Sequence, residues 1–322
     1  MNTPIRIELP TIFGMKTVNA YLFLEPTPTL IDCGEQTDKS WDALQKALAE
    51  HNLKIQDLAR VIITHAHVDH IGMAGKIAAE SPNTEIWVSE FAYNWAVNPK
   101  EMNNIRQEVM QEYMQLFPQF VNSPFQQMMV QLYKTASSAW GEIPKDRVRR
   151  FTLDEKLRLG NLDWEIIYAP GHCNHQTCFY QPETRQMISA DMLLAITPSP
   201  VIDVTLKPPY KREKSLHQMI ESLHKFAAID IDQVYPGHYE PFQNHRELIQ
   251  KQLDRIIMRK NQCFALIKSG TDDFFELLTQ LYGKNFTIPA IPMLVGYLDL
   301  LTEENLITVS KTEQGLKYQV QE

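Results

Sequence analysis

Four segments that are typical of buried strands each end directly before a histidine or an aspartate. Residues 60–64 precede the motif HAHVDH, while WEIIYAPGH ends at His172, RQMISAD at Asp191 and DQVYPGH at His238. Apolar and β-branched residues fill the strand parts, and glycine lets the backbone turn before two of the histidines. Since a layered domain of sheets and helices collects its functional groups at strand ends, the four segments predict one shared site.

The segment THAHVDHIG, residues 64–72, places three histidines and one aspartate within six positions. The residues before it predict a strand, and the alanine-rich residues 71–80 predict a helix. In extended backbone the side chains alternate between two faces, which puts His65 and His67 on the same face. Imidazole and carboxylate groups are common ligands of divalent metals. The segment therefore predicts a metal site at a turn between strand and helix.

Composition disfavours several classes of partner. The 322 residues carry a formal net charge of −8, so no global positive charge points to nucleic acid or an anionic membrane. The four cysteines have no zinc-finger spacing and are too few for a disulfide scaffold. The first ten residues lack the apolar core of a signal peptide, and no apolar run is long enough to span a bilayer. We expect a cytoplasmic protein that acts on a small molecule, without a nucleic-acid or membrane partner.

Residues 91 to about 146 predict a helical insert between the histidine-rich motif and His172. This stretch contains five methionines and nine aromatic residues and is interrupted by Pro118 and Pro124. Methionine adapts its shape to varied apolar partners. The insert is compatible with a lid over the site, a hairpin packed on the core, or a homodimer interface. The lid would favour a substrate that carries a sizeable apolar group.

The residues from 245 onward predict a small module of helices followed by a β-hairpin, which is the order of a winged helix. Winged helices often bind DNA. Residues 245–322 contain nine Lys or Arg and ten Asp or Glu, and the helix expected over residues 293–306 has no Lys or Arg. Contacts to phosphate supply most nonspecific DNA affinity, so this helix is poorly equipped for it. We expect a structural or substrate-channel module.

The order and spacing of these motifs resemble those of the metallo-β-lactamase superfamily. The matching residues are the Asp32-Cys33-Gly34 turn and the ligand-type residues His65, His67, Asp69, His70, His172, Asp191 and His238. The closest subgroup is the glyoxalase-II-like hydrolases with a winged-helix-like C-terminal segment. The resemblance implies an α+β fold, a four-layer αββα sandwich over residues 1–244 that carries the helical insert, and a winged-helix-like module over residues 245–322.

The resemblance also implies a binuclear site. One metal would be held by His65, His67 and His172, the other by Asp69, His70 and His238, and Asp191 would bridge the two. The residue types agree, because three imidazoles and an exchangeable water form an open catalytic site. A donor set of imidazoles and carboxylates suits two divalent ions, Zn²⁺ first, with Fe or Mn as alternatives.

Two further residues have two interpretations each. Asp32 is expected to orient a ligating imidazole from behind, as its family equivalent does, although an aspartate before Gly34 is also typical of a turn. His175, three residues after His172, either lines the substrate pocket or is a solvated loop residue. Asp69 and Asp191 are the expected catalytic residues, Asp69 as a ligand that also steers protons.

The expected activity is that of a metal-dependent hydrolase. A metal-bridging hydroxide would attack an activated ester-type carbonyl, with a thioester or lactone favoured, because such leaving groups need less protonation than an amine. An endoribonuclease or phosphodiesterase of the same fold is the alternative, since the same metals and hydroxide serve a phosphodiester. A regulator that binds its ligand without turnover is the second alternative.

Overall fold

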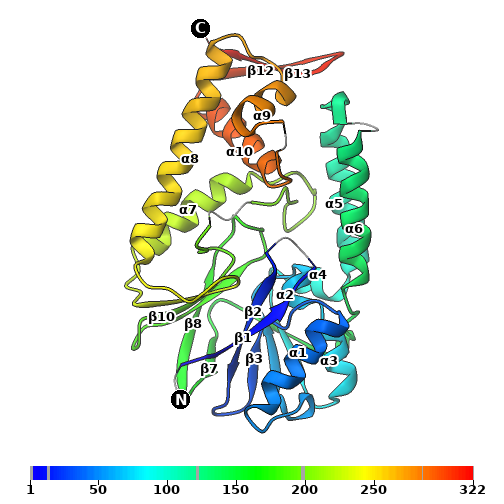
Figure 1. The fold of residues 1–322 in the computed structure, drawn as a ribbon, viewed down its shortest axis with the longest axis vertical. Coiled ribbons are helices and arrows are strands. Elements are labelled where there is room, and N and C mark those ends of the chain that lie inside the picture. The colour runs from blue at the N-terminus through cyan, green and yellow to red at the C-terminus, as the bar shows by residue number, and fades with distance from the viewer. Residues whose placement is uncertain (1–2, 13–14, 121–122, 197–199, 285, 322) are drawn as a thin grey trace.

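Two β-sheets lie against each other in the lower part of the molecule, and helices cover both outer faces (Figure 1). The computed structural model describes residues 3–12, 15–120, 123–196, 200–284 and 286–321. Among these residues, none of the helices is both long and apolar enough to cross a membrane.

The first sheet contains six strands in chain order. They are β1 (Ile5–Pro10), β2 (Thr17–Phe23), β3 (Thr29–Ile31), β4 (Arg60–Ile63), β5 (Glu85–Ser89) and β6 (Val148–Phe151). β1, β2 and β3 pair antiparallel, whereas β3 to β6 pair parallel. The central parallel strands β4 and β5 are mostly apolar and buried, as expected for strands covered on both faces, whereas Arg149 and Arg150 of the edge strand β6 are exposed.

The second sheet has the order β11-β10-β9-β8-β7. Its strands are β7 (Lys156–Leu159), β8 (Leu162–Tyr168), β9 (Thr177–Gln181), β10 (Gln186–Ala190) and β11 (Gln233–Pro236). β10 and β11 are parallel, and the other neighbours are antiparallel. Both parallel strands therefore end at the same edge of the sheet.

Three apolar clusters define four layers. One cluster fills the space between the sheets and contains Phe23, Trp164 and Phe179. A second joins the outer face of the first sheet to α1 (Asp38–Ala49) and α3 (Ala74–Glu80), and a third joins the second sheet to α7 (Ser215–Ala227). The expected αββα sandwich is confirmed.

The helix expected over residues 71–80 is divided in two. A one-turn helix, α2 (Val68–Ile71), carries His70, and α3 begins only at Ala74. Between them, Gly72 lies so close to the insert that a Cβ there would be 2.6 Å from the carbonyl oxygen of Ala139. This contact separates the histidine-rich turn from the longer helix.

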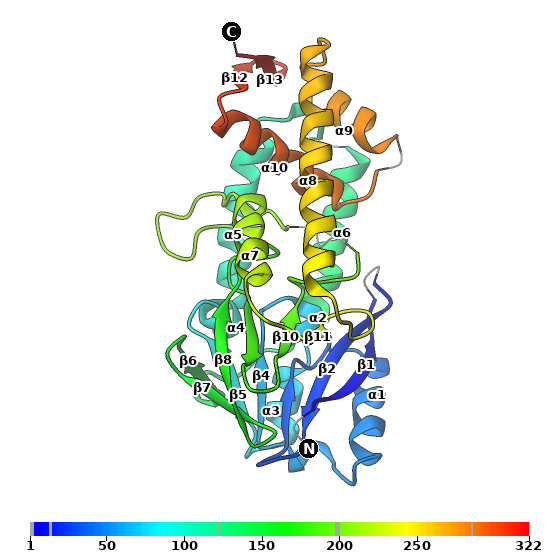
Figure 2. The same cartoon turned by 90° about the vertical axis from the view of Figure 1, so that its left-hand side faces the viewer.

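The insert forms α4 (Tyr93–Val97), α5 (Pro99–Met114) and α6 (Pro124–Ser138), and leads from the sandwich toward the C-terminal module (Figures 1 and 2). Its far end contacts that module at several residues. Phe117 packs on Phe274 with ring centroids 4.5 Å apart, the Leu316 N–H donates to the Leu116 carbonyl, and Gln119 donates to Asp273. On α6, Met128 and Val130 are 46% and 48% exposed.

The C-terminal module contains α8 (His245–Lys268), α9 (Phe274–Tyr282), α10 (Ala290–Glu303) and a hairpin of β12 (Ile307–Thr312) and β13 (Gly315–Val320). α8 runs from the sandwich to the far end of the molecule in both views (Figure 2). The apolar cluster that covers the second sheet continues into α8, α9 and α10. This cluster contains residues from both sides of residue 244. A domain boundary at residue 244 is therefore a proposal.

Candidate metal centre

All seven ligand-type residues expected from the sequence converge at one edge of the sandwich. His65 and His67 follow β4, and Asp69 and His70 lie on α2. The other three follow strands of the second sheet, namely His172 after β8, Asp191 after β10 and His238 after β11. Their nitrogen and oxygen atoms form overlapping groups that are close enough to hold metal ions.

His65, His67 and His172 make up the three-histidine group. His67 Nδ1 lies 3.1 Å from His65 Nε2 and 2.9 Å from His172 Nε2. The alternation expected of extended backbone explains the first distance, because His65 and His67 are two residues apart beyond the end of β4. Three imidazole nitrogens therefore face one common point.

Asp69, His70, Asp191 and His238 make up the carboxylate–histidine group. His238 Nε2 lies 3.3 Å from Asp69 Oδ2 and 3.4 Å from Asp191 Oδ2. His70 Nε2 lies 3.4 Å from the other oxygen of Asp191. Asp191 also approaches the three-histidine group, with Oδ2 at 3.5 Å from His172 Nε2. Asp191 therefore lies between the two groups.

Hydrogen bonds from behind fix the orientation of the imidazoles. His70 Nδ1 donates to Asp32 Oδ2 at 2.8 Å, and His238 Nδ1 donates to the Thr17 carbonyl at 2.7 Å. Thr64 donates to Asp32 through both its backbone N–H and its hydroxyl, and that hydroxyl lies 3.0 Å from His65 Nδ1. These contacts leave the Nε2 atoms pointing into the centre. Asp32 thus has the contact expected of an orienting carboxylate.

Backbone geometry near the centre is tight at three positions. Asp32 and Ala190 adopt positive φ angles of 56° and 46°, which are uncommon for non-glycine residues. A Cβ at Gly237 would lie 2.2 Å from Asp191 Oδ1 and 2.9 Å from the ring of His70. Position 237 therefore requires glycine, because any side chain there would collide with Asp191 and His70.

The carboxylate–histidine group is strongly charged in the absence of metal. Burial alone would lower the pKa of His70 and His238, but the neighbouring Asp191 and Asp69 raise both, that of His238 to about 10. Burial alone would raise the pKa of Asp69 and Asp191, yet the two imidazoles lower both pKa values below their ordinary range. In metal-free protein, the protonated imidazoles therefore supply the positive charge that balances the two carboxylates.

The three-histidine group has the opposite character. Burial, assisted by the neighbouring imidazoles, holds the pKa of His65 and His67 well below the usual value, so both are neutral at pH 7. Neutral imidazole is the form that binds metal.

Three buried donor atoms that face the centre have no hydrogen-bond partner among the described residues. They are His70 Nε2, His238 Nε2 and Asp191 Oδ1. A buried polar atom without a partner is costly, so such atoms in a cluster call for an ion or a water. A set of imidazole and carboxylate donors suits zinc, iron or manganese. The residues of this chain therefore fit a divalent metal centre.

His175 is not a solvated loop residue, and that interpretation is wrong. Its side chain is 1% exposed, its Nδ1 accepts the Ala66 N–H at 3.3 Å, and its ring lies 5.3 Å from that of Trp95. Trp95 belongs to α4 of the insert, which covers this loop. That His175 lines a substrate pocket stays a prediction. In the structure its ring lies beside the ring of His67, with centroids 5.8 Å apart.

The sequence did not single out Thr64 or Thr17. Thr64 connects Asp32 to His65, and Thr17 orients His238 through its carbonyl oxygen. A threonine that directly precedes the first ligand is a signal available in the sequence. The role of Thr17 has no such signal, because any residue supplies a backbone carbonyl.

Comparison with known proteins agrees with this architecture. Residues 14–238 match the sequence profile of the Metallo-beta-lactamase superfamily. The probable metallo-hydrolase YqjP of Bacillus subtilis is 28% identical over 309 residues, covering 94% of this chain and 93% of that protein.

Two solved structures share the fold over nearly the whole chain. The metallo-beta-lactamase family protein TTHA1429 of Thermus thermophilus has a TM-score of 0.81 at 20% identity, covering 100% of this chain and 99% of that one. A beta-lactamase domain protein of Burkholderia ambifaria has a TM-score of 0.75 at 19% identity, covering 98% and 91%. The likeness therefore extends over the insert and the C-terminal module as well as the sandwich. Because the profile match spans more than half of the residues and includes the whole ligand set, the chain belongs to the metallo-beta-lactamase superfamily.

Proposed function

We propose that the protein is a hydrolase that uses two divalent metal ions, Zn²⁺ in preference to Fe or Mn. The observation that carries this proposal is the convergence of seven ligand-type side chains, of which three buried nitrogen or oxygen atoms have no hydrogen-bond partner among the described residues. The name of the Bacillus subtilis relative, probable metallo-hydrolase, supports the same activity.

In this proposal the three-histidine group would hold one ion and Asp69, His70 and His238 the other, and Asp191, which faces both groups, would be shared between them. When bound, two such ions supply a hydroxide at neutral pH and polarise the bond under attack. Asp32 and the Thr17 carbonyl keep the proton of each imidazole on Nδ1, so that Nε2 is free to bind.

The two carboxylates have different tasks in this proposal. The side chain of Asp191 is 4% exposed and faces both groups, which suits a bridge. The side chain of Asp69 is 17% exposed, so it is the carboxylate nearer to solvent and to an incoming substrate. We therefore assign to Asp69 the transfer of protons between substrate and solvent, in addition to ligation.

The favoured substrate is a thioester or lactone that carries an apolar group. A thiolate or alkoxide leaves with less protonation than an amine, which suits a site in which Asp69 is the assigned proton carrier. The start of the insert contributes the half-buried rings around Tyr168, on which Phe91 stacks with ring centroids 4.1 Å apart. These aromatic side chains support an apolar group on the substrate.

Two alternatives remain within the proposal. A phosphodiesterase or endoribonuclease would use the same ions, but the net charge of −8 and the lack of Lys or Arg on α10 disfavour a polyanion. A regulator that binds without turnover would not need the full set of donors. We also propose a cytoplasmic location and a small-molecule substrate, with a homodimer as an open possibility.

The test combines metal analysis with one substrate panel. Purified protein is expected to contain close to two divalent ions per chain, and His67→Ala to lose at least one of them together with activity. His224→Ala is the matched control, because His224 is an exposed histidine on α7 away from the centre. The panel contains acyl-thioesters, lactones, a β-lactam, a phosphodiester and single-stranded RNA, each assayed with the same metals.

Folded protein that binds no metal when metal is supplied would contradict the metal centre. Turnover of RNA at low salt, lost in His172→Ala and without activity on the esters, would favour the nuclease. Low salt is needed because weak phosphate contacts fade steeply as salt rises. Full metal loading without turnover of any substrate class would favour the regulator.

A further inference from the structure

A loop that contacts the residues next to His172 also contacts α10, and so connects the metal centre to the C-terminal module. Residues 203–213 fold back on themselves, since the Thr205 N–H donates to the Lys211 carbonyl at 2.9 Å and the Glu213 N–H donates to the Asp203 carbonyl at 2.8 Å. This stretch, called the 203–213 loop below, is therefore one hydrogen-bonded unit in which Val204 is paired opposite Arg212.

One end of the loop holds the backbone that carries His172. Asp203, only 1% exposed, accepts the Asn174 N–H at 3.1 Å and the Val204 N–H at 2.8 Å. The side-chain amide of Asn174 donates to the Val204 carbonyl, and the Val201 N–H donates to the His172 carbonyl at 2.9 Å. Buried hydrogen bonds of this kind fix the path of residues 172–174.

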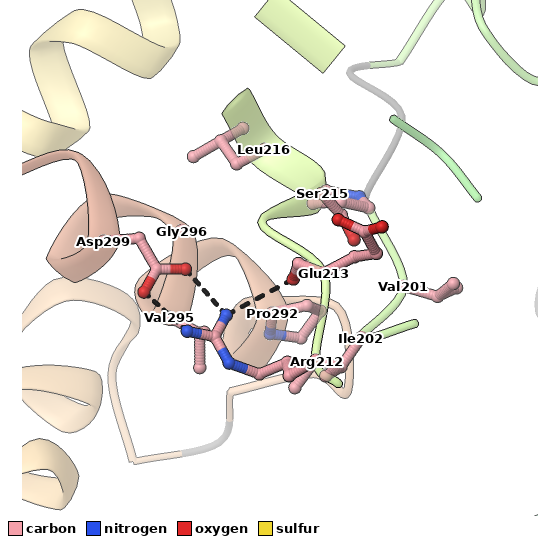
Figure 3. Close-up of a pocket in the computed structure, with 11 residues that line it drawn as sticks. Val201, Ile202, Arg212, Glu213, Ser215, Leu216, Pro292, Val295, Gly296 and Asp299 are labelled. Atoms are coloured by element: carbon pink, nitrogen blue, oxygen red, sulfur yellow. Dashed lines mark hydrogen bonds and ion pairs between the residues drawn. The ribbon is translucent and has the colours of Figure 1, made fainter. Parts of the chain in front are cut away.

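The other end of the loop is held by α10. The guanidinium of Arg212 makes two parallel bonds of 2.7 Å to the carboxylate of Asp299, as Figure 3 shows. Both side chains are only 18% exposed. The ring of Tyr113 at the end of α5 lies 4.7 Å from the guanidinium. A two-bond pair between Arg and a carboxylate fixes orientation as well as distance.

α10 is a firm base for this pair because it packs closely on α7. A Cβ at Gly296 would lie 2.5 Å from the Cβ of Leu216, so the two helices are in contact at that point. Arg212, Leu216, Gly296 and Asp299 line one small pocket between α7 and α10, and in Figure 3 the guanidinium of Arg212 reaches Asp299 there. The position of Asp299 is therefore set by α7, which covers the second sheet.

We propose that Arg212 and Asp299 are positioning residues for the metal centre. Their ion pair ties the 203–213 loop to α10, and the loop, through Asp203 and Val204, holds Asn174 and with it the backbone that carries His172. This inference rests on the proposed function, because it takes His172 as a metal ligand. In this inference the C-terminal module stabilises the position of one metal ligand, His172, without contacting the metal site itself.

The test compares Arg212→Met with Lys260→Met. Lys260 is a matched control because it also pairs with a carboxylate at α10, that of Glu304 at the C-cap, and its side chain is 15% exposed, but it reaches this position from α8. The first readout is amide hydrogen exchange of residues 172–175 in metal-free protein. The second is the affinity of the three-histidine group for Co²⁺, followed by its visible absorption. Arg212→Lys, which keeps the charge and loses the second bond, is the milder variant if Arg212→Met does not fold.

Arg212→Met is expected to speed exchange of residues 172–175 about tenfold and to weaken Co²⁺ binding by roughly 10–100-fold, the range seen when residues behind metal ligands are changed. Lys260→Met is expected to change neither. Arg212→Asp combined with Asp299→Arg restores the pair in reverse and is expected to recover at least part of both losses.

Exchange and affinity in Arg212→Met that equal those of Lys260→Met would overturn the inference. A wild-type protein that binds no Co²⁺ would instead overturn the proposed metal centre, while the exchange readout still reports on the link between Arg212 and residues 172–175. The two failures are thus separate.

Discussion

The two groups of the metal centre are supported by different parts of the chain. In the carboxylate–histidine group, the imidazoles of His70 and His238 are oriented by the first sheet, through Asp32 after β3 and the carbonyl of Thr17 at the start of β2. In the three-histidine group, His172 depends on the 203–213 loop, and through it on α10. One half of the centre is therefore set by the sandwich alone, whereas the other half also requires the rest of the molecule.

The two groups also differ in charge. His65 and His67 have lowered pKa values and are ready to bind a metal, whereas His70 and His238 have raised pKa values and must first lose protons. Metal binding to the carboxylate–histidine group therefore releases protons from its imidazoles. Metal binding to the three-histidine group requires no proton release from His65 and His67. This difference makes the two halves separable by experiment.

The largest expected effect is at Asp191, which faces both groups. Asp191→Asn removes a negative charge from between two cations, so we expect both sites to weaken by more than about 100-fold, beyond the range for residues behind the ligands. Metal content per chain, measured after dialysis, checks this. Loss of one ion with the other retained would show that Asp191 is a ligand of a single site.

Asp32→Asn is expected to separate the two groups. Asp32 contacts His70 directly but reaches His65 only through the Thr64 hydroxyl. We expect the carboxylate–histidine group to lose roughly 10–100-fold in affinity and the three-histidine group to lose less. Stepwise titration with Co²⁺ distinguishes the two sites, and equal losses at both would contradict the separate supports.

The pH dependence of stability is expected to differ between metal-free and metal-bound protein. The folded-state pKa of His238, about 10, lies above its unfolded value near 6.5. Its protonation therefore stabilises the metal-free fold fully below pH 6.5, and this stabilisation is lost as pH rises toward 10. Metal needs the neutral imidazole, so its own stabilising effect grows over the same range.

The measurement is the thermal midpoint between pH 6.5 and 10, with and without metal. The midpoint of the metal-free protein is expected to fall as pH rises, and the difference between the two forms to widen. A gap that narrows with rising pH would show that the protons on His70 and His238 do not compete with the metal.

The smallest expected effect is at His175. Its Nδ1 accepts the N–H of Ala66, the residue between His65 and His67, and one hydrogen bond contributes about 1 kcal/mol net. His175→Ala is therefore expected to weaken only the three-histidine group, by about fivefold. A loss of turnover with unchanged metal affinity would instead return His175 to the substrate pocket.

The ligand set could be predicted from the sequence because each ligand directly follows a strand. Strands are recognised by their apolar, β-branched residues, and the sheet then brings their ends together, as with Asp191 and His238 after the parallel strands β10 and β11. The αββα layers follow from the same pattern once the family resemblance is added.

Apart from Asp32, which the family resemblance indicated, the supports of the centre could not be predicted, because they depend on contacts between distant segments. Arg212 and Asp299 are 87 residues apart and lie in a loop and on a helix face without a motif. The burial of His175 was missed for the same reason, since Trp95 of the insert covers it. The local sequence pattern predicts which residues follow a strand. The contacts that orient these residues are seen only in the folded structure.

The contact between the far end of the insert and the C-terminal module has a consequence for synthesis of the chain. Gln119 and its partner Asp273 are separated by 154 residues, and Phe117 packs on the neighbouring Phe274. A ribosome therefore releases the insert well before the surface that receives it. Until residues 274–316 have emerged, Leu116 and Phe117 remain exposed on the nascent chain, where apolar surface invites aggregation or a chaperone.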